Sequence, residues 1–176
     1  MSMRKTLLFF FSVCWSLAGS AESSPDLGQK APGDFLKQGN YDVFPDGEGL
    51  PEGLGNARQG DVIYSQHCQT CHGLKGEGGS AEELAGALHG LTDNPPDKTI
   101  GTYWPYATTL FDFIRRSMPL SAPGSLTNNQ LYAVTAYLLY INRIIKSEDE
   151  ISAKTLPRII MPNNKGFIDV YEGQSH

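Results

Sequence analysis

The chain has 176 residues, of which 40% are hydrophobic, and it carries 14 Lys and Arg against 19 Asp and Glu, a formal net charge of −5. This length accommodates one domain, or one domain with extensions. The acidic balance argues against nucleic acid as a partner. It is typical of a protein that meets other proteins through complementary patches, or whose charge simply keeps it in solution.

Residues 1–21 have the pattern of a secretory signal peptide. Arg4 and Lys5 precede an apolar stretch at 6–17, and small residues at 18–21 favour cleavage after Ala21. The apolar stretch is too short to span a bilayer. We therefore expect a periplasmic protein with no membrane span. Removing the two basic residues leaves 12 Lys and Arg against 19 Asp and Glu, a net charge of −7.

The next segment, residues 22–53, is rich in Gly, Pro, Asp and Ser, which predicts an irregular N-terminal extension. The first helix is then predicted over 57–67, with Asn56 as its N-cap. Gly60 and Tyr64 are four residues apart and so share one face of this helix. Because Gly inside a helix costs about 1 kcal/mol relative to Ala, Gly60 indicates the close approach of another helix.

This helix leads into a C-x-x-C-H pentapeptide, Cys68-Gln69-Thr70-Cys71-His72. The spacing predicts covalent attachment of haem c, in which each thiol forms a thioether with a vinyl group. His72 then supplies the proximal imidazole ligand. A zinc site would need two further ligands, and a thioredoxin-like pair would need a βαβ context. A Cys68–Cys71 disulfide is the competing interpretation for an exported chain, although so small a loop restricts the unfolded chain little.

Residues 73–107 combine a glycine-rich loop with aromatic residues. The loop at 73–79 matches neither a P-loop nor a dinucleotide fingerprint, and we expect it to turn the backbone away from a bulky ring. A short helix is predicted over 81–88, followed by irregular structure. Tyr103 and Trp104 each carry a donor able to reach a haem propionate, although ordinary core packing explains each ring equally well.

Two further helices are predicted in the second half of the chain. One begins at Thr108 or Thr109 and ends before Met118-Pro119, because proline disfavours helix at the preceding residue. The clearest helix has a capping box at Thr127 and Gln130. Its apolar residues recur at spacings of three and four: Leu131, Val134, Leu138, Ile141 and Ile145. Residues 147–176 are predicted to be an extended C-terminal tail.

The sixth position of the iron requires a distal ligand, and a methionine there is typical of an electron carrier with a raised potential. Beyond residue 21 the chain has two methionines, Met118 and Met161. Met118 is favoured because it lies on a proline-marked loop just before the last helix. Met161 lies in the tail, where methionine more often fills a core. The weaker alternatives are His67, His89 and His176.

Several of these features together resemble class I c-type cytochromes over residues 54–146. They are Gly60, Tyr64, the pentapeptide, Met118-Pro119 and Tyr137 of the last helix. The resemblance implies an all-α class I cytochrome c fold, with helices packed around one covalent haem and irregular extensions at both ends. It also implies that the first and last helices cross at Gly60, Tyr64 and Tyr137.

A narrower resemblance is to the cytochrome subunits of sulfur-oxidising dehydrogenases. It is carried by residues 98–119, 125–127 and 132–139 and by the tail segments 154–157 and 161–163. It implies a periplasmic, non-catalytic carrier of single electrons, docked to a molybdenum-cofactor subunit and passing electrons to a downstream cytochrome or an oxidase.

The choice among such proteins depends on the number of haems. Sulfane dehydrogenase cytochromes often carry two haems and this chain has one C-x-x-C-H, so a monohaem sulfite dehydrogenase subunit is favoured. The alternatives are a sulfane dehydrogenase subunit and a general periplasmic carrier for another dehydrogenase. A haem enzyme or sensor with an open distal position is a further alternative.

Overall fold

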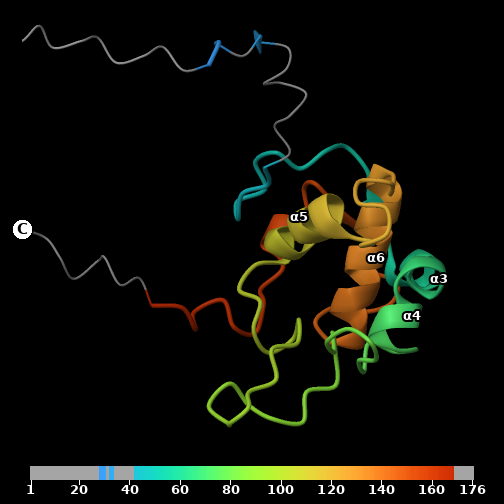
Figure 1. The fold of residues 1–176 in the computed structure, drawn as a ribbon, viewed down its shortest axis with the longest axis vertical. Helices are drawn as coiled ribbons and strands as arrows, with labels where there is room; N and C mark the ends of the chain where they lie inside the picture. The colour runs from blue at the N-terminus through green and yellow to red at the C-terminus, as the bar shows by residue number, and fades with distance from the viewer. Residues whose placement is uncertain (1–27, 31, 34–41, 169–176) are drawn as a thin grey trace, which may run out of the picture. The chain divides into compact units, whose positions relative to one another are not determined.

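The computed structural model describes residues 28–30, 32–33 and 42–168, so the expected signal peptide and His176 lie outside the described residues. The chain divides into two units, Met1–Lys37 and Gln38–His176, and the fold that follows is that of the second unit (Figure 1). Its elements in chain order are β1 (Leu54–Gly55), α3 (Ala57–His67), α4 (Gln69–His72), α5 (Ala107–Ser117), α6 (Asn128–Ile141), β2 (Ile151–Ser152) and the 3-10 helix η2 (Leu156–Arg158).

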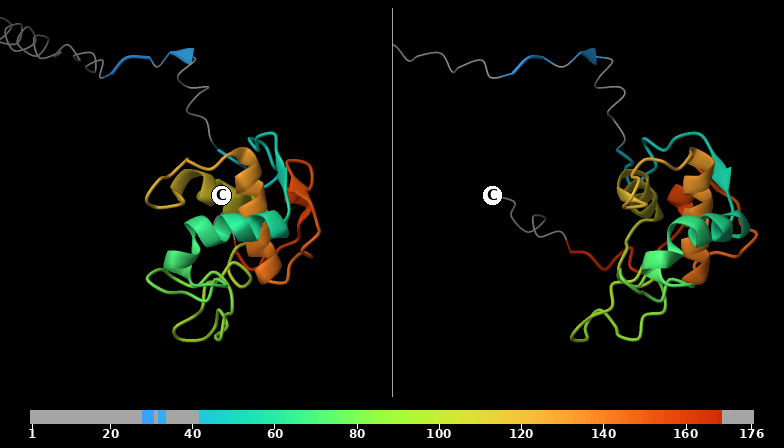
Figure 2. Two further views of the ribbon diagram at one scale, coloured as in Figure 1. Left: turned by 90° about the vertical axis from the view of Figure 1, so that its right-hand side faces the viewer. Right: turned by 45° about the vertical axis from the view of Figure 1, so that its right-hand side comes forward.

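The crossing of α3 and α6 is the central contact of the fold (Figure 2). The N-terminus of α3 is fixed by a capping box, in which Asn56 and Gln59 each accept a hydrogen bond from the other's backbone N–H. A Cβ at Gly60 would lie 2.7 Å from the Cβ of Tyr137. The rings of Tyr64 and Tyr137 pack with centroids 4.9 Å apart. The predicted crossing of the first and last helices is therefore confirmed.

The core lies between α6 and the helices that flank it. Every residue of α6 from Leu131 to Leu139 is buried, as expected for a helix that is apolar around its whole circumference. On one side α5 contributes Phe111, whose ring packs on Tyr132 at 4.6 Å between centroids. Within the described residues, no helix combines the length and the apolar character needed to cross a bilayer.

The last helix is shorter than its apolar periodicity predicts: it ends at Ile141 and does not continue to Ile145. Asn142 is the C-cap of the helix, and its side chain forms contacts both with the last turn and with segments outside the helix. Its side-chain amide donates to the carbonyls of Leu138 at 2.8 Å and Leu84 at 3.0 Å, and its oxygen accepts from Gly101 N at 3.0 Å. A side chain with both donors and an acceptor satisfied by neighbouring segments stabilises the helix end.

The helix predicted over 81–88 does not form. The backbone N–H groups of Leu84 and Ala85 donate to the carbonyl of Gly76 rather than to carbonyls within the segment. Further along, the N–H groups of Leu88 and His89 donate to the carboxylate of Asp97. These contacts fix the long connection between α4 and α5 as irregular structure, which extends away from the helices (Figure 1).

The C-terminal tail contributes more to the core than its composition indicates. β2 pairs antiparallel with β1, aligning Gly55 with Ile151. Ile151, Leu156 and Met161 are all at most 2% exposed. Three residues of the predicted extended tail are therefore part of the core, whereas others, such as Ile160 and Ile168, are exposed.

Candidate functional site

A cavity of about 320 Å³ lies beside the C-terminal end of α3 and contains the predicted haem-binding side chains. Cys68, Cys71, His72 and Met118 all line it. The rest of its wall is mostly apolar and includes Leu84, Ile100, Trp104, Leu110, Phe113, Ile114, Val134 and Leu138. This volume and this lining are those of a cofactor pocket, in which a few polar groups converge within an apolar wall.

The two cysteines are placed by the junction of α3 and α4. Cys68 ends α3 and precedes α4, and Cys71 lies one turn later and is exposed. Burial, and secondarily the neighbouring Cys71, raise the pKa of Cys68 to about 11. A thiol with that pKa stays protonated at neutral pH, whereas disulfide oxidoreductases keep a thiol of lowered pKa. The environment thus disfavours the thioredoxin-like interpretation.

His72 is oriented by a backbone contact. Its Nδ1 lies 2.8 Å from the carbonyl oxygen of Glu82. Since a carbonyl only accepts hydrogen bonds, Nδ1 carries the proton and Nε2 keeps its lone pair. Metal-bound histidines commonly donate their second ring nitrogen to such a carbonyl, which fixes the tautomer and the ring orientation. Nε2 of His72 is therefore able to act as a metal ligand.

The loop that follows His72 holds the Glu82 carbonyl in place. The N–H of Gly78 donates to the carbonyl of His72, and the N–H of Ala81 donates to that of Cys71, both at 2.9 Å. Gly78 has a positive φ of 93°, a conformation that glycine adopts without strain. Tyr64 ties the start of the same loop to α3, because its hydroxyl donates to the Gly73 carbonyl at 2.8 Å.

Met118 and the alternative distal ligands occupy different places. Met118 follows the last residue of α5 in extended backbone and reaches the cavity wall. Met161 is 1% exposed in the core and does not line the cavity. His67 is exposed at the cavity mouth. His89 pairs with Asp97 at 3.4 Å, away from the cavity lining, and His176 lies outside the described residues.

The two aromatic candidates for propionate contacts are also separated. Trp104 lines the cavity and packs edge-on against Phe113, with centroids 5.7 Å apart. Tyr103 is not among the lining residues, and its ring packs against Phe167 at 5.4 Å. The structure thus brings Trp104, but not Tyr103, to the wall of the cavity.

Sequence reasoning missed the contact of Glu82 and most of the apolar wall. The Glu82 contact is made by a backbone carbonyl, which any residue carries, so no residue pattern marks it. Leu84, Val134 and Leu138 were recognisable as apolar, but apolar periodicity does not separate a cofactor wall from ordinary core.

Comparison with known proteins defines the class of this protein. A family model described as cytochrome c oxidase, cbb3-type, subunit III matches residues 55–138, from β1 to the last turn of α6. A comparison with curated proteins found no match. The chain belongs to the c-type cytochrome family, for which haem is the cofactor and electron transfer the function.

The more particular likeness is to a chain in the crystal structure of the sulfane dehydrogenase SoxCD from Paracoccus pantotrophus. The two chains are 35% identical and superpose with a TM-score of 0.76, over 87% of this chain and 76% of that one. The predicted class I cytochrome c fold and the resemblance to cytochromes of sulfur oxidation are both confirmed.

Proposed function

We propose that this protein is a monohaem cytochrome c that carries one electron at a time. Cys68 and Cys71 hold the haem through thioethers, and His72 and Met118 are its axial ligands. The observation that carries the proposal is that all four side chains line one apolar cavity. A haem iron with two protein ligands exchanges electrons without binding a substrate, so the chain is non-catalytic.

The residues around the cavity have distinct roles in this proposal. The Glu82 carbonyl keeps the His72 ring in one tautomer and raises its basicity as a ligand. The apolar wall excludes water, and a low local polarity is one of the means by which proteins tune a haem. Trp104, which lines the cavity, is a better candidate than Tyr103 for a hydrogen bond to a propionate.

The partner we propose as electron donor is a molybdenum-cofactor subunit of a sulfite dehydrogenase, and the acceptor is a downstream cytochrome or an oxidase. The likeness to a chain of SoxCD supports a dehydrogenase of sulfur oxidation. Residues 1–21 would export the chain to the periplasm, where haem c attachment and such partners are expected.

A second candidate is the cytochrome subunit of a sulfane dehydrogenase. The SoxCD likeness favours it directly, because that structure is of a sulfane dehydrogenase. The single C-x-x-C-H of this chain favours the monohaem sulfite enzyme instead. The two candidates share the cavity, the ligands and the carrier role, and they differ only in the donor.

The deciding experiment uses the protein purified from a host that attaches haem c. Its mass should include one haem, its spectrum should show c-type bands, and the reduced form should not bind carbon monoxide readily. A mass without haem would support the disulfide alternative, and tight carbon monoxide binding without displacement of a methionine would support a haem enzyme or sensor. Reduction by sulfite plus a molybdenum sulfite dehydrogenase would identify the donor, and failure of that reduction would point to another one.

A further inference from the structure

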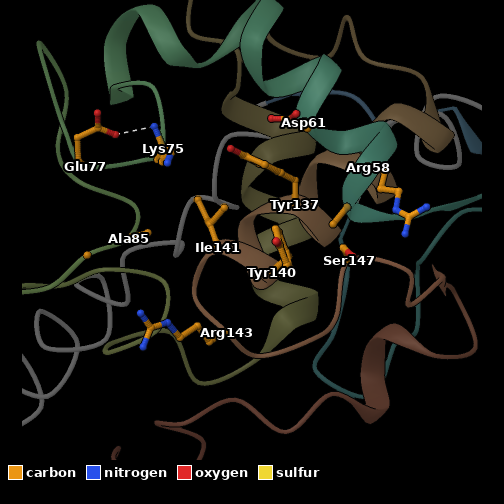
Figure 3. Close-up of a pocket in the computed structure, with 12 residues that line it drawn as sticks. Arg58, Asp61, Lys75, Glu77, Ala85, Tyr137, Tyr140, Ile141, Arg143 and Ser147 are labelled. Atoms are coloured by element: carbon orange, nitrogen blue, oxygen red, sulfur yellow. Dashed lines mark hydrogen bonds between the residues drawn. The ribbon is translucent and has the colours of Figure 1, made fainter.

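A second hollow, with a volume of about 700 Å³, lies between α3, the glycine-rich loop and the end of α6 (Figure 3). We call it the α3–α6 groove. It shares no lining residue with the haem cavity, so the function proposed above makes no use of it. Its volume is in the range of pockets that hold a drug-sized ligand, and it is therefore larger than one small anion requires.

Three cations stand around this groove (Figure 3). They are Arg58 of α3, Lys75 of the glycine-rich loop and Arg143 just beyond α6. None of the three takes part in an ion pair within the described residues. Arg58 attracts the Glu148 carboxylate and Lys75 attracts that of Glu77, in neither case as an ion pair.

The two acidic residues of the groove already have donors. The carboxylate oxygens of Glu77 accept hydrogen bonds from the backbone N–H groups of Leu74 at 3.2 Å and Lys75 at 2.6 Å. Burial and then the adjacent Asp61 carboxylate raise the pKa of Tyr137, so Asp61 already faces a hydroxyl. These neutral donors leave both carboxylates charged, so the groove has three cations against two anions and a small positive balance.

The floor of the groove is aromatic and apolar. Tyr137, Tyr140 and Ile141 lie in the middle, with the three cations around them (Figure 3). Tyr140 is 43% exposed, so much of its ring is available for contact. Protein interfaces are enriched in tyrosine and arginine, and an apolar centre with a polar rim is their usual arrangement.

We propose that the α3–α6 groove docks an acidic segment of a partner protein. Carboxylates of that segment face Arg58, Lys75 and Arg143, and an apolar or aromatic side chain between them packs on the floor. The local charge is opposite to the net charge of −5 of the whole chain. A nucleic acid or an anionic membrane is large enough to extend beyond the groove, where the acidic residues of the rest of the chain would repel it. A short peptide segment fits within the groove and avoids this repulsion.

This docking site extends the proposed function rather than restating it. A segment held in the α3–α6 groove contacts none of the residues that line the haem cavity, because the two hollows share no lining residue. The cytochrome could then stay bound to one protein while exchanging electrons with another.

The test is a calorimetric titration of the full-length haem-loaded protein at low ionic strength. The probes are an Asp- and Glu-rich octapeptide with a central Phe, a Lys-rich octapeptide of the same length, and inorganic phosphate. The test variant is Arg58→Gln with Arg143→Gln, both exposed. The matched control is Lys154→Gln with Arg158→Gln, which changes the net charge equally at exposed positions outside the groove.

We expect the acidic octapeptide to bind and the test variant to weaken that binding by about three- to thirtyfold. The control should change it by less than about twofold. Equal weakening by the control would show a general charge effect and overturn the proposal. The proposal would also be overturned if phosphate bound as tightly as the acidic peptide, if the Lys-rich peptide bound more tightly, or if the acidic peptide did not bind. The absorption spectrum of the same samples tests the haem proposal separately.

Discussion

Met118 is the residue on which the proposed carrier role most depends, because a haem iron whose sixth position is filled by the protein carries electrons, whereas one with an open position binds ligands. Met118→Leu removes the thioether but nearly preserves the side-chain volume at the cavity wall. We expect the reduced variant to bind carbon monoxide and its reduction potential to fall, as measured by absorption spectroscopy and redox titration.

Met161→Leu is the matched control for that variant. Met161 is buried in the core and does not line the cavity. Its replacement should leave the spectrum and the potential unchanged and cost less than about 1.5 kcal/mol of stability. An unchanged spectrum in Met118→Leu together with a changed one in Met161→Leu would reverse the ligand assignment.

We expect Tyr132 to make the free energy of unfolding depend on pH in the alkaline range. It is fully buried, its hydroxyl donates to the Pro51 carbonyl at 2.8 Å, and burial raises its pKa to about 12. In the unfolded chain the pKa is about 10, so between these two values the folded state binds more protons than the unfolded state. The free energy of unfolding should therefore fall as pH rises from about 10 to about 12.

Denaturant titrations of the wild type and Tyr132→Phe at several pH values measure this dependence. The variant should lose about 1–2 kcal/mol near neutral pH, because the Pro51 carbonyl loses its donor. Its stability should decline less steeply above pH 10 than that of the wild type. An identical slope in both proteins would assign the alkaline loss to another group, such as Tyr64, whose pKa is also raised by burial.

The four residues proposed to hold the haem could be selected from the sequence because each carries its chemistry in a side chain at a characteristic spacing, and all four line one cavity. Cys68, Cys71 and His72 form a motif that is highly specific for haem attachment. Met118 is recognisable from the proline that follows it in a loop. The Glu82 carbonyl could not be found, because it depends on how the loop from Gly73 folds back. The sequence also could not predict that Tyr103 lies away from the cavity, because adjacent residues such as Tyr103 and Trp104 point in different directions in irregular structure.

At the scale of elements, the contact between α3 and α6 depends on the absence of a side chain. Gly60→Ala would raise helix propensity by about 1 kcal/mol, but its Cβ would lie 2.7 Å from the Cβ of Tyr137 and collide with the Ala133 carbonyl. Overpacking of this kind typically costs about 1–3 kcal/mol. We expect the variant to be less stable in denaturant titrations despite its better helix former.

The control for the crossing is Gln66→Ala, which lies in the same helix at an exposed position. Its stability should stay within about 0.5 kcal/mol of the wild type. A stabilised Gly60→Ala would mean that the two helices can separate without loss, and that the crossing contributes little to the fold.

The tail following α6 should behave as part of the core. Leu156 opens η2 and is 0% exposed, so Leu156→Ala should cost about 2–5 kcal/mol in denaturant titrations. Ile160, which is 76% exposed, provides the comparison, and Ile160→Ala should cost less than about 0.5 kcal/mol. Similar small effects at both positions would mean that the tail contributes little to the stability of the core.

The tail also shows why the extent of the domain was harder to predict than its centre. The capping boxes at Asn56 and Thr127 are local, so the starts of α3 and α6 follow from a few consecutive residues. Ile151 is buried where β2 pairs with β1, which lies about a hundred residues earlier, and Leu156 follows in η2, which packs against α5. Composition averaged over a segment does not reveal such a long-range pair.

At the scale of the whole molecule, the mouth of the haem cavity is where we expect an electron-exchange partner to approach. Leu120 lines the cavity and yet is 81% exposed, so a partner that covers the mouth would bury it. Leu120→Ser should slow electron exchange with a protein partner by about tenfold, corresponding to about 1.4 kcal/mol of lost apolar burial. Reduction by a small inorganic reductant, which needs no docked surface, should change little.

Stopped-flow reduction by the protein donor and by the small reductant measures both rates on the same samples. Leu74→Ser is the matched control, because Leu74 is 66% exposed but does not line the cavity. It should leave both rates unchanged. If Leu74→Ser slowed the protein reaction and Leu120→Ser did not, the partner would approach over the glycine-rich loop. Because Lys75 of that loop lines the α3–α6 groove, the docking and electron-exchange surfaces would then coincide instead of lying apart.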